Sequence, residues 1–103
     1  MAEPLRLGVV SASAGVYQKS GEAVVGIRLT DDSSARFADF TRINIGQMID
    51  IRIDGKSVVK PVVREPIIGG VLQISIDRPA DAELLAARLN NRTATVEVEA
   101  VPR

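Results

Sequence analysis

Residues 24–55 read VVGIRLTDDSSARFADFTRINIGQMIDIRIDG, and this stretch decides the fold class. At both of its ends, apolar side chains recur at every second position, which predicts two strands that each bury one face. Between them, Phe37 and Phe40 lie three residues apart, the spacing at which side chains share one face of a helix. The stretch therefore predicts a strand over 24–29, a helix, and a second strand over 49–53.

The ends of this helix are marked by residues that satisfy its free backbone groups. Thr30 is the predicted N-cap, and Asp31 and Asp32 would place carboxylates in the first turn, where they complement the helix dipole. Gly46 stands where a left-handed glycine ends a helix. The same acidic cluster could instead hold a hard metal ion or a phosphate. We favour capping, because no second acidic cluster lies nearby in the sequence.

The flanking sequence supplies further strands and a second helix. Alternating apolar residues predict strands over 5–9, 72–76 and 93–101, whereas the small residues 11–15 are expected to form a loop or bulge. Pro79 fits the first position of a helix, whose apolar stripe consists of Ala82, Leu85, Ala86 and Leu89. These patterns predict an α+β fold with a mainly antiparallel sheet and both helices packed on one face. The preferred topology is a ferredoxin-like core plus an N-terminal strand or hairpin.

The pair Asp54-Gly55 is the strongest hairpin signal in the chain. A plain two-residue turn would place Lys56 and Lys60 on the apolar face of the preceding strand. A bulge at Gly55 would shift the register and place Val59 there instead. We favour the bulge, because burying two lysines is costly.

The composition excludes several kinds of site. The 103 residues include no histidine and no cysteine, so the commonest general base and metal ligand and every thiolate ligand are absent. Thirteen basic residues balance thirteen acidic residues, and no predicted strand carries an aromatic residue on which bases could stack. Both observations argue against nucleic-acid binding. We therefore expect one domain over 1–103 with no catalytic, metal or cofactor site.

The termini and the apolar runs bear on location. No apolar run approaches the roughly 20 residues that span a bilayer, so the chain is not expected to cross a membrane itself. The first residues do not have the pattern of a signal peptide. Two interpretations stay open: Ala2 is the first residue left after a signal peptide has been removed, with Met1 added, or the chain has a plain cytosolic start.

Residues 58–68 combine β-branched apolar side chains with two prolines. Because Pro61 and Pro66 lack N–H donors, this segment is predicted to be a sheet edge or a loop. It could bind an extended peptide by adding it to the sheet. Alternatively, it is an edge that proline and lysine protect against aggregation. The candidate protein-binding residues are Val59, Pro61, Val63, Pro66, Ile67 and Ile68.

Residues 24–90 resemble the head subdomain in the first periplasmic domain of the SecD and SecDF protein-export membrane proteins. The resemblance rests on the order and spacing of short pieces: Phe37, Thr41, Asn44 and Gly46, then Asp54-Gly55-Lys56, Pro61-Val62-Val63, Gly69-Gly70 and Gln73-Ile74-Ser75. Two departures are visible. Arg78 replaces the threonine cap usual before Pro79, and Asn90-Asn91-Arg92 replaces a Gly-Ala-Leu segment.

We favour a free-standing, exported relative of that subdomain over a domain taken from SecD itself. The expected function is a non-catalytic periplasmic or cell-envelope module that binds protein or an extended peptide and is accessory to protein export. One alternative is a structural or oligomerising accessory domain that binds no client. A less favoured alternative is a small hydrolase, which an apolar pocket with converging carboxylates would support.

Overall fold

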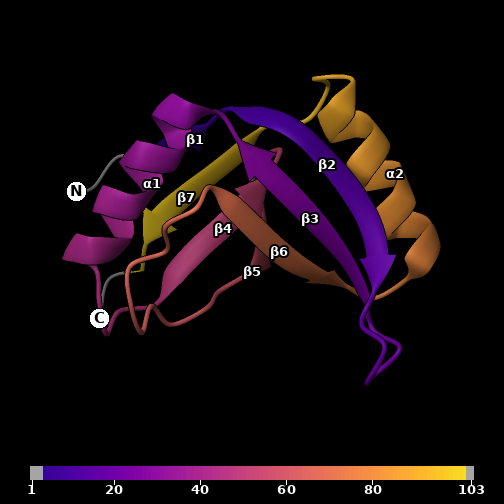
Figure 1. Ribbon diagram of the computed structural model, residues 1–103, viewed down its shortest axis with the longest axis horizontal. Helices are drawn as coiled ribbons and strands as arrows, with labels where there is room; N and C mark the ends of the chain where they lie inside the picture. Colours follow the sequence, from indigo (N-terminus) through magenta and orange to yellow (C-terminus); the bar gives the residue numbers. More distant parts are fainter. Residues whose placement is uncertain (1–3, 102–103) are drawn as a thin grey trace.

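The computed structural model describes residues 4–101, which form two helices and seven strands (Figure 1). The expected cleavage point before Ala2 lies outside these residues. The elements in chain order are β1 (Leu5–Leu7), β2 (Val9–Val16), β3 (Ala23–Leu29), α1 (Asp31–Ile43), β4 (Ile49–Ile53), β5 (Lys56–Val59), β6 (Val71–Ile76), α2 (Pro79–Asn90) and β7 (Val96–Ala100).

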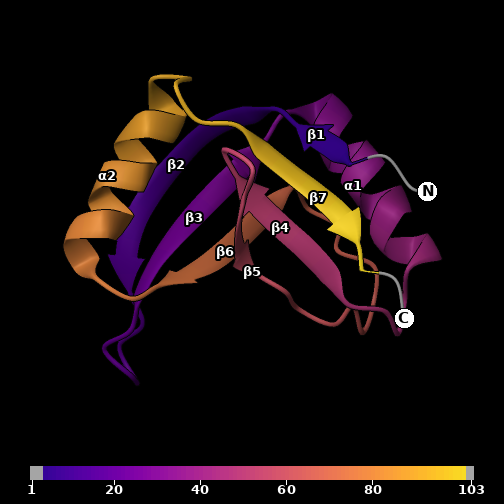
Figure 2. The same cartoon turned by 180° about the vertical axis from the view of Figure 1, so that it is seen from behind.

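The strands form two antiparallel sheets. A four-stranded sheet has the order β1-β7-β4-β5, and a three-stranded sheet has the order β2-β3-β6. In the first sheet, Ile51 of β4 pairs with Val98 on one side and Val59 on the other. In the second, Val25 of β3 pairs with Ala14 and Ile74. The three-stranded sheet faces the viewer in Figure 1, and the four-stranded sheet does so in Figure 2.

One apolar core lies between the two sheets. Its fully buried members from the strands are Val25, Ile27, Ile49, Ile74, Val96 and Val98. Phe37 from α1 and Leu89 from α2 belong to the same cluster, and Leu85 packs against it. The periodicity of the sequence therefore identified the buried face of each of these elements correctly.

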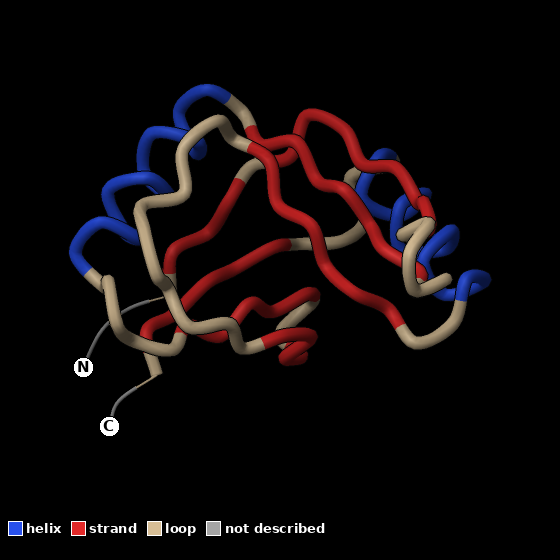
Figure 3. The backbone as a smooth tube through the Cα atoms, turned by 60° about the horizontal axis from the view of Figure 1, so that its bottom comes forward, coloured by secondary structure: helices blue, strands red, loops and turns tan. Residues whose placement is uncertain are grey.

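The predicted α+β class and antiparallel pairing are confirmed, but the strands divide between two sheets, and the helices lie at opposite ends of the molecule (Figure 3). The division occurs at Gly8, between β1 and β2. Its N–H donates to the Ser33 hydroxyl over 2.8 Å, and its carbonyl accepts from the Thr30 N–H over 3.0 Å. A Cβ at Gly8 would lie 3.2 Å from the Thr30 side chain. Glycine thus lets the chain pass close to the start of α1 as it changes sheets.

Residues 11–15, which were expected to form a loop or bulge, belong to β2 instead. Pairing with β3 runs from Val9 to Val16, and only the step between Val9 and Ser11 is irregular. Alanine and glycine favour strands weakly, and the alternation of alanine with serine is only a faint apolar signal, so the sequence pattern did not indicate a strand here. The backbone hydrogen bonds to β3 nevertheless hold the segment extended.

The β4–β5 hairpin combines the two alternatives for its register. Asp54 and Gly55 both have positive φ angles, 53° and 82°, as a two-residue turn of the type that suits hairpins requires. The bulge lies further along β5, because Ser57 pairs with Arg52 whereas Val59 pairs with Ile51. Val59 therefore takes the place predicted for it, although the extra residue is Val58 and not Gly55.

The two helices begin with unequal caps. The Thr30 hydroxyl accepts from the Ser33 N–H at the start of α1, as predicted. Helix α2 has Pro79 in its first turn, but its N-cap residue, Arg78, makes no side-chain hydrogen bond to the helix. Arg78 stands where the family that this chain resembles usually has a threonine cap. The first N–H groups of α2 therefore donate no hydrogen bond to an N-cap side chain.

Gly69 and Gly70 form a tight turn that leads into β6. Both have positive φ angles, 101° and 73°. A Cβ at Gly69 would meet nothing within 4 Å, whereas a Cβ at Gly70 would lie 2.7 Å from the Ser34 hydroxyl and 3.1 Å from Ser34 Cβ. The absent side chain at Gly70 lets the turn lie directly against α1.

Replacing Arg78 with threonine should stabilise the protein. A hydroxyl at the N-cap would accept from a free N–H of α2, and such caps contribute about 1 kcal/mol. The free energy of unfolding, measured by urea titration, should rise by about that amount. The matched control is Thr30→Ala, which removes the cap that α1 already has. This substitution should lower the free energy of unfolding by a similar amount. An unchanged midpoint for Arg78→Thr would contradict the capping argument.

Alanine substitutions in the glycine turn should separate backbone strain from steric overlap. Gly69→Ala should destabilise the fold by about 1–2 kcal/mol, the cost of a left-handed conformation for a residue with a side chain. Gly70→Ala should cost more, because the added Cβ also overlaps Ser34, and rotating the hydroxyl relieves only part of that overlap. If the two variants lowered the melting temperature equally, the contact between Gly70 and α1 would not be tight.

Candidate protein-binding site

The six predicted binding residues do not form one exposed surface. Val63 is 3% exposed and belongs to the core, whereas Ile68 is 72% exposed. Val59 and Ile67 are half-buried and pack against the core. The remaining two members, Pro61 and Pro66, are half-buried as well. Of the set, Ile68 offers the most side-chain surface to a partner.

Hydrogen bonds fix the segment that carries these residues. The Val63 N–H donates to the Gln47 carbonyl over 2.9 Å, and the Val63 carbonyl accepts from the Gly46 N–H over 2.7 Å. Further along, the Ile67 N–H donates to the hydroxyl of Thr41 over 2.9 Å, and Thr41 is fully buried. The segment therefore presents its exposed side chains in one defined arrangement.

A group of exposed apolar residues adjoins this segment, and sequence reasoning missed it. Ile43 and Ile45 follow the buried stripe of α1, and Met48 forms an isolated β-bridge with Val62. All four are exposed, Ile43 to 78%. The available signal was that Ile43 lies two residues after Thr41, off the stripe that faces the core. We call Ile43, Ile45, Met48 and Val62 the apolar patch.

The outer face of the three-stranded sheet is hollowed into a groove of about 460 Å³. Small residues from β2 and β3 line much of it, and larger side chains come from β3 and β6: Ser11, Ser13, Gly26, Arg28, Val71 and Gln73. The Tyr17 hydroxyl donates to Gln73 Oε1 over 2.5 Å. The small side chains of β2, which made this strand hard to predict from the sequence, thus leave room for the groove on this face.

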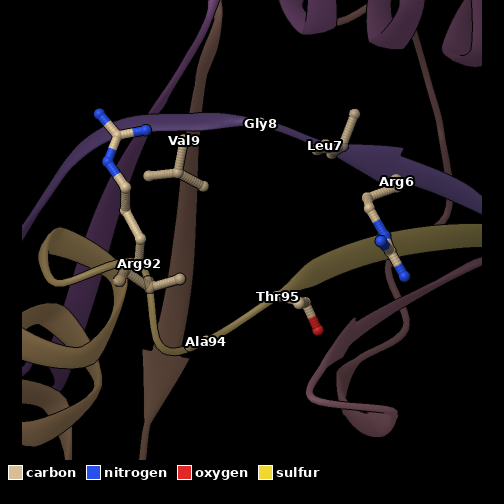
Figure 4. A pocket seen from close by; sticks show the side chains of 8 residues that line it. Arg6, Leu7, Gly8, Val9, Arg92, Ala94 and Thr95 are labelled. Carbon is tan, nitrogen blue, oxygen red and sulfur yellow. The ribbon is translucent and has the colours of Figure 1, made fainter.

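A smaller pocket of about 170 Å³ lies where β1 joins β2, next to the end of α2 (Figure 4). Arg6 and Arg92 lie on either side of it. The positive φ of Arg92, 61°, belongs to the termination of α2, because the Arg92 N–H donates to the Leu89 carbonyl over 3.2 Å. None of the residues that line this pocket carries a carboxylate, so it does not have the converging acids that a hydrolase would need.

The remaining sequence candidates take structural roles. The acidic residues at the start of α1 accompany the Thr30 cap, and Asp32 pairs with Arg36 over 3.5 Å. Within residues 4–101, three metal-ligating side chains do not come together at any point. Neither helix in this part of the chain is long and apolar enough to cross a membrane.

Comparison with known proteins gives a consistent family. A family model described as SecDF, P1 head subdomain, matches residues 8–93. The protein translocase subunit SecD of Acidaminococcus fermentans is 40% identical over 84 residues, which are 81% of this chain and 20% of that protein. This chain belongs to the SecDF P1 head subdomain family. The resemblance inferred from the sequence is therefore confirmed.

Other members of the SecD and SecDF group agree. The protein translocase subunit SecDF of Thermus thermophilus is 35% identical over 68 residues, 65% of this chain and 9% of that protein. A crystal structure of SecDF in a super-membrane-facing form matches with a TM-score of 0.77 and 26% identity over 92% of this chain and 13% of that chain. A structure of "a membrane component SecDF that enhances protein export" matches with the same TM-score of 0.77 and the same identity of 26%. That match covers 93% of this chain and 44% of that chain. The chain thus spans about a fifth or less of the two translocase subunits named here.

The residues that suggested the SecDF head hold the fold together. Phe37 lies in the core, and Thr41 anchors the segment that precedes β6. The Asn44 side chain donates to the Phe40 carbonyl over 2.7 Å and so ends α1. Gly46 takes the positive φ, 86°, predicted for a glycine after the helix. These contacts explain how the residues that resemble the SecDF head specify the fold. None of these four residues belongs to the candidate binding residues.

Ion pairs join the elements of the four-stranded sheet to their surroundings. The Asp54 carboxylate accepts from the Thr95 N–H over 2.9 Å and pairs with Arg88 of α2. These two interactions, the Thr95 hydrogen bond first, hold the pKa of Asp54 below its ordinary value. The β4–β5 turn is therefore connected to α2 and to the residue before β7 through one ionised side chain.

A second charged group lies on the outer face of the same sheet. Asp50 and Glu99 are directly opposite each other on β4 and β7, and Arg52 pairs with both, over 2.8 Å and 2.7 Å. Burial raises the pKa of Asp50, but the nearby Ser57 hydroxyl and the hydrogen bond from Arg52 outweigh that effect and leave the pKa lowered. Arg52 thereby offsets the repulsion between two facing carboxylates.

The Asp54 contacts should make stability depend on pH in acid. Because the folded-state pKa lies below the ordinary value of 3.8, the stabilisation is fully present above pH 3.8 and is lost as the pH falls through the folded-state pKa. Asp54→Asn should lower the melting temperature at pH 7, and the difference from the parent chain should shrink toward pH 2. A difference of the same size at both pH values would contradict this assignment.

Proposed function

We propose that this chain is a non-catalytic periplasmic or cell-envelope module that binds unfolded protein segments and is accessory to protein export. The observation that carries the proposal is membership of the SecDF P1 head subdomain family across residues 8–93. The relatives are named protein translocase subunits, and one solved relative is described as enhancing protein export. A head subdomain of such a protein would meet chains that have not yet folded.

The surface of the molecule supports a protein ligand over a small molecule. Ile68 and Val62 expose branched side chains on a segment that hydrogen bonds hold in place, and Ile43, Ile45 and Met48 add exposed apolar side chains from α1 and the residues after it. Exposed apolar side chains gathered in one region commonly mark sites of protein contact. The groove and the smaller pocket, by contrast, are lined largely by small or polar groups and open to solvent.

A peptide titration followed by NMR tests the proposal. An unfolded, apolar-rich peptide should shift the amide signals of Val59, Ile67 and Ile68, and a length-matched peptide with serine in place of its apolar residues should not. Ile68→Ser should weaken binding and leave the fold intact, because its side chain is mostly exposed. Flat spectra at millimolar peptide would reject client binding.

The apolar patch supports a second candidate function, that of a structural or oligomerising accessory domain. Ile43, Ile45, Met48 and Val62 could be covered by another copy or a fixed partner. Sedimentation at high protein concentration decides between the two for the isolated chain. A dimer that Ile43→Lys dissociates would favour the accessory role, and a monomer would count against it.

A further inference from the structure

The two sheets have four edge strands, and three of these edges are protected. Strand β1 has only three residues and carries Arg6 at its centre. Strand β5 contains a bulge and is followed directly by Lys60 and Pro61. Short length, bulges, lysine and proline are the features by which natural sheets prevent another chain from pairing with an edge.

The edge of β2 is closed by a side chain of α2. The Ala12 N–H donates to Asn90 Oδ1 over 2.8 Å, and Asn90 Nδ2 donates to the Ala12 carbonyl over 2.8 Å. The amide of Asn90 thus occupies both backbone groups that Ala12 turns away from β3. Asn90 is one of the residues at which this chain departs from the SecDF head pattern. Its side chain lies where the backbone of a neighbouring strand would otherwise bond to Ala12.

Strand β6 has none of these protections. Its sequence, VLQISI over Val71–Ile76, contains no charge, no proline and no glycine, and it consists largely of residues that favour strands. Within residues 4–101 it pairs with β3 alone. Val71 is 52% exposed, and Gln73 and Ser75 are exposed as well.

The register shows which backbone groups of β6 point to the open side. The Leu29 N–H donates to the Gly70 carbonyl over 2.8 Å, which makes these two residues a hydrogen-bonded pair. Hydrogen-bonded pairs alternate along an antiparallel ladder, so Leu72 and Ile74 bond to β3 through the pairs with Ile27 and Val25. The N–H and carbonyl groups of alternate residues therefore point away from β3, namely those of Val71, Gln73 and Ser75.

We infer that β6 accepts an extended polypeptide segment as a fourth strand of the three-stranded sheet. This inference rests on the proposed function and specifies how the client is held. A row of outward backbone donors and acceptors with a regular spacing is matched by the backbone of another extended chain. Such pairing requires no particular client sequence, which suits a module that meets many unfolded chains.

The two faces of the sheet would set a mild preference for the bound segment. Its residues opposite Leu72 and Ile74 would turn to the buried side of the sheet, where β5 lies against β6. Its alternate residues would lie on the outer face beside the groove, next to Val71 and Gln73. A segment that alternates apolar and polar side chains therefore fits best.

Amide hydrogen exchange of the full chain tests the inference. The probe is a ten-residue peptide of alternating valine and threonine with a lysine at each end. In the free protein, the amides of Val71, Gln73 and Ser75 should exchange rapidly, and those of Leu72 and Ile74 slowly. Saturating peptide should slow the first group at least tenfold. Peptide binding that leaves the first group unprotected would overturn strand addition and leave the proposed function standing, whereas absence of binding would overturn both.

A proline variant supplies an independent measurement. Ser75→Pro removes an outward N–H that the ladder with β3 does not use, and its ring blocks the approach of a strand. It should weaken peptide binding about tenfold, whereas Ser75→Thr, which keeps the N–H, should not. If the proline variant does not fold, a peptide methylated at its central backbone nitrogens replaces it and should lose affinity similarly. Equal affinities would overturn the inference, as would a dimer of the free chain in which these amides are already protected.

Discussion

The inner faces of the three-stranded and four-stranded sheets pack against each other and form one apolar core. This packing fixes the positions of the outer faces, the edges and the helices. Val25, Ile27 and Ile74 from one sheet and Ile49, Val96 and Val98 from the other are all fully buried. Truncating any one of them would leave a cavity, which typically costs about 2–5 kcal/mol for a large aliphatic side chain. Because both inner faces are committed to the core, a partner can reach the outer faces, the edges, the exposed sides of the helices and the connecting segments.

The chain treats these accessible regions unequally. Arg52 pairs with both Asp50 and Glu99 on the outer face of the four-stranded sheet, so these three charges largely balance one another. On the outer face of the three-stranded sheet, small residues leave a groove. Asn90 closes the edge of β2, while the edge of β6 stays regular and uncharged. Ile68 and the apolar patch add exposed apolar side chains, which we propose contact client protein.

Sequence reasoning succeeded where the physical cause is local. Thr30 and Gly46 were identified because helix ends are set by groups within a few residues. The place of Val59 opposite Ile51 followed from the cost of burying lysine, although the extra residue proved to be Val58. Strand β2 was missed because serine, alanine and glycine give only a faint apolar alternation, whereas its pairing with β3 depends on the tertiary structure. Val63 was included among exposed candidates because its burial depends on Gln47 and Gly46, which lie far away in the sequence.

The amino-acid sequence by itself determined the helices, most of the strands, the buried face of each and the resemblance to the SecDF head, because all of these follow from periodicity, caps and the order of short motifs. Only the tertiary structure decided that the strands form two sheets, that Asn90 closes one edge and that, among residues 4–101, no strand pairs with the second side of β6. These features depend on which strands become neighbours, and that choice is made by contacts between residues such as Ala12 and Asn90 that lie 78 positions apart in the chain.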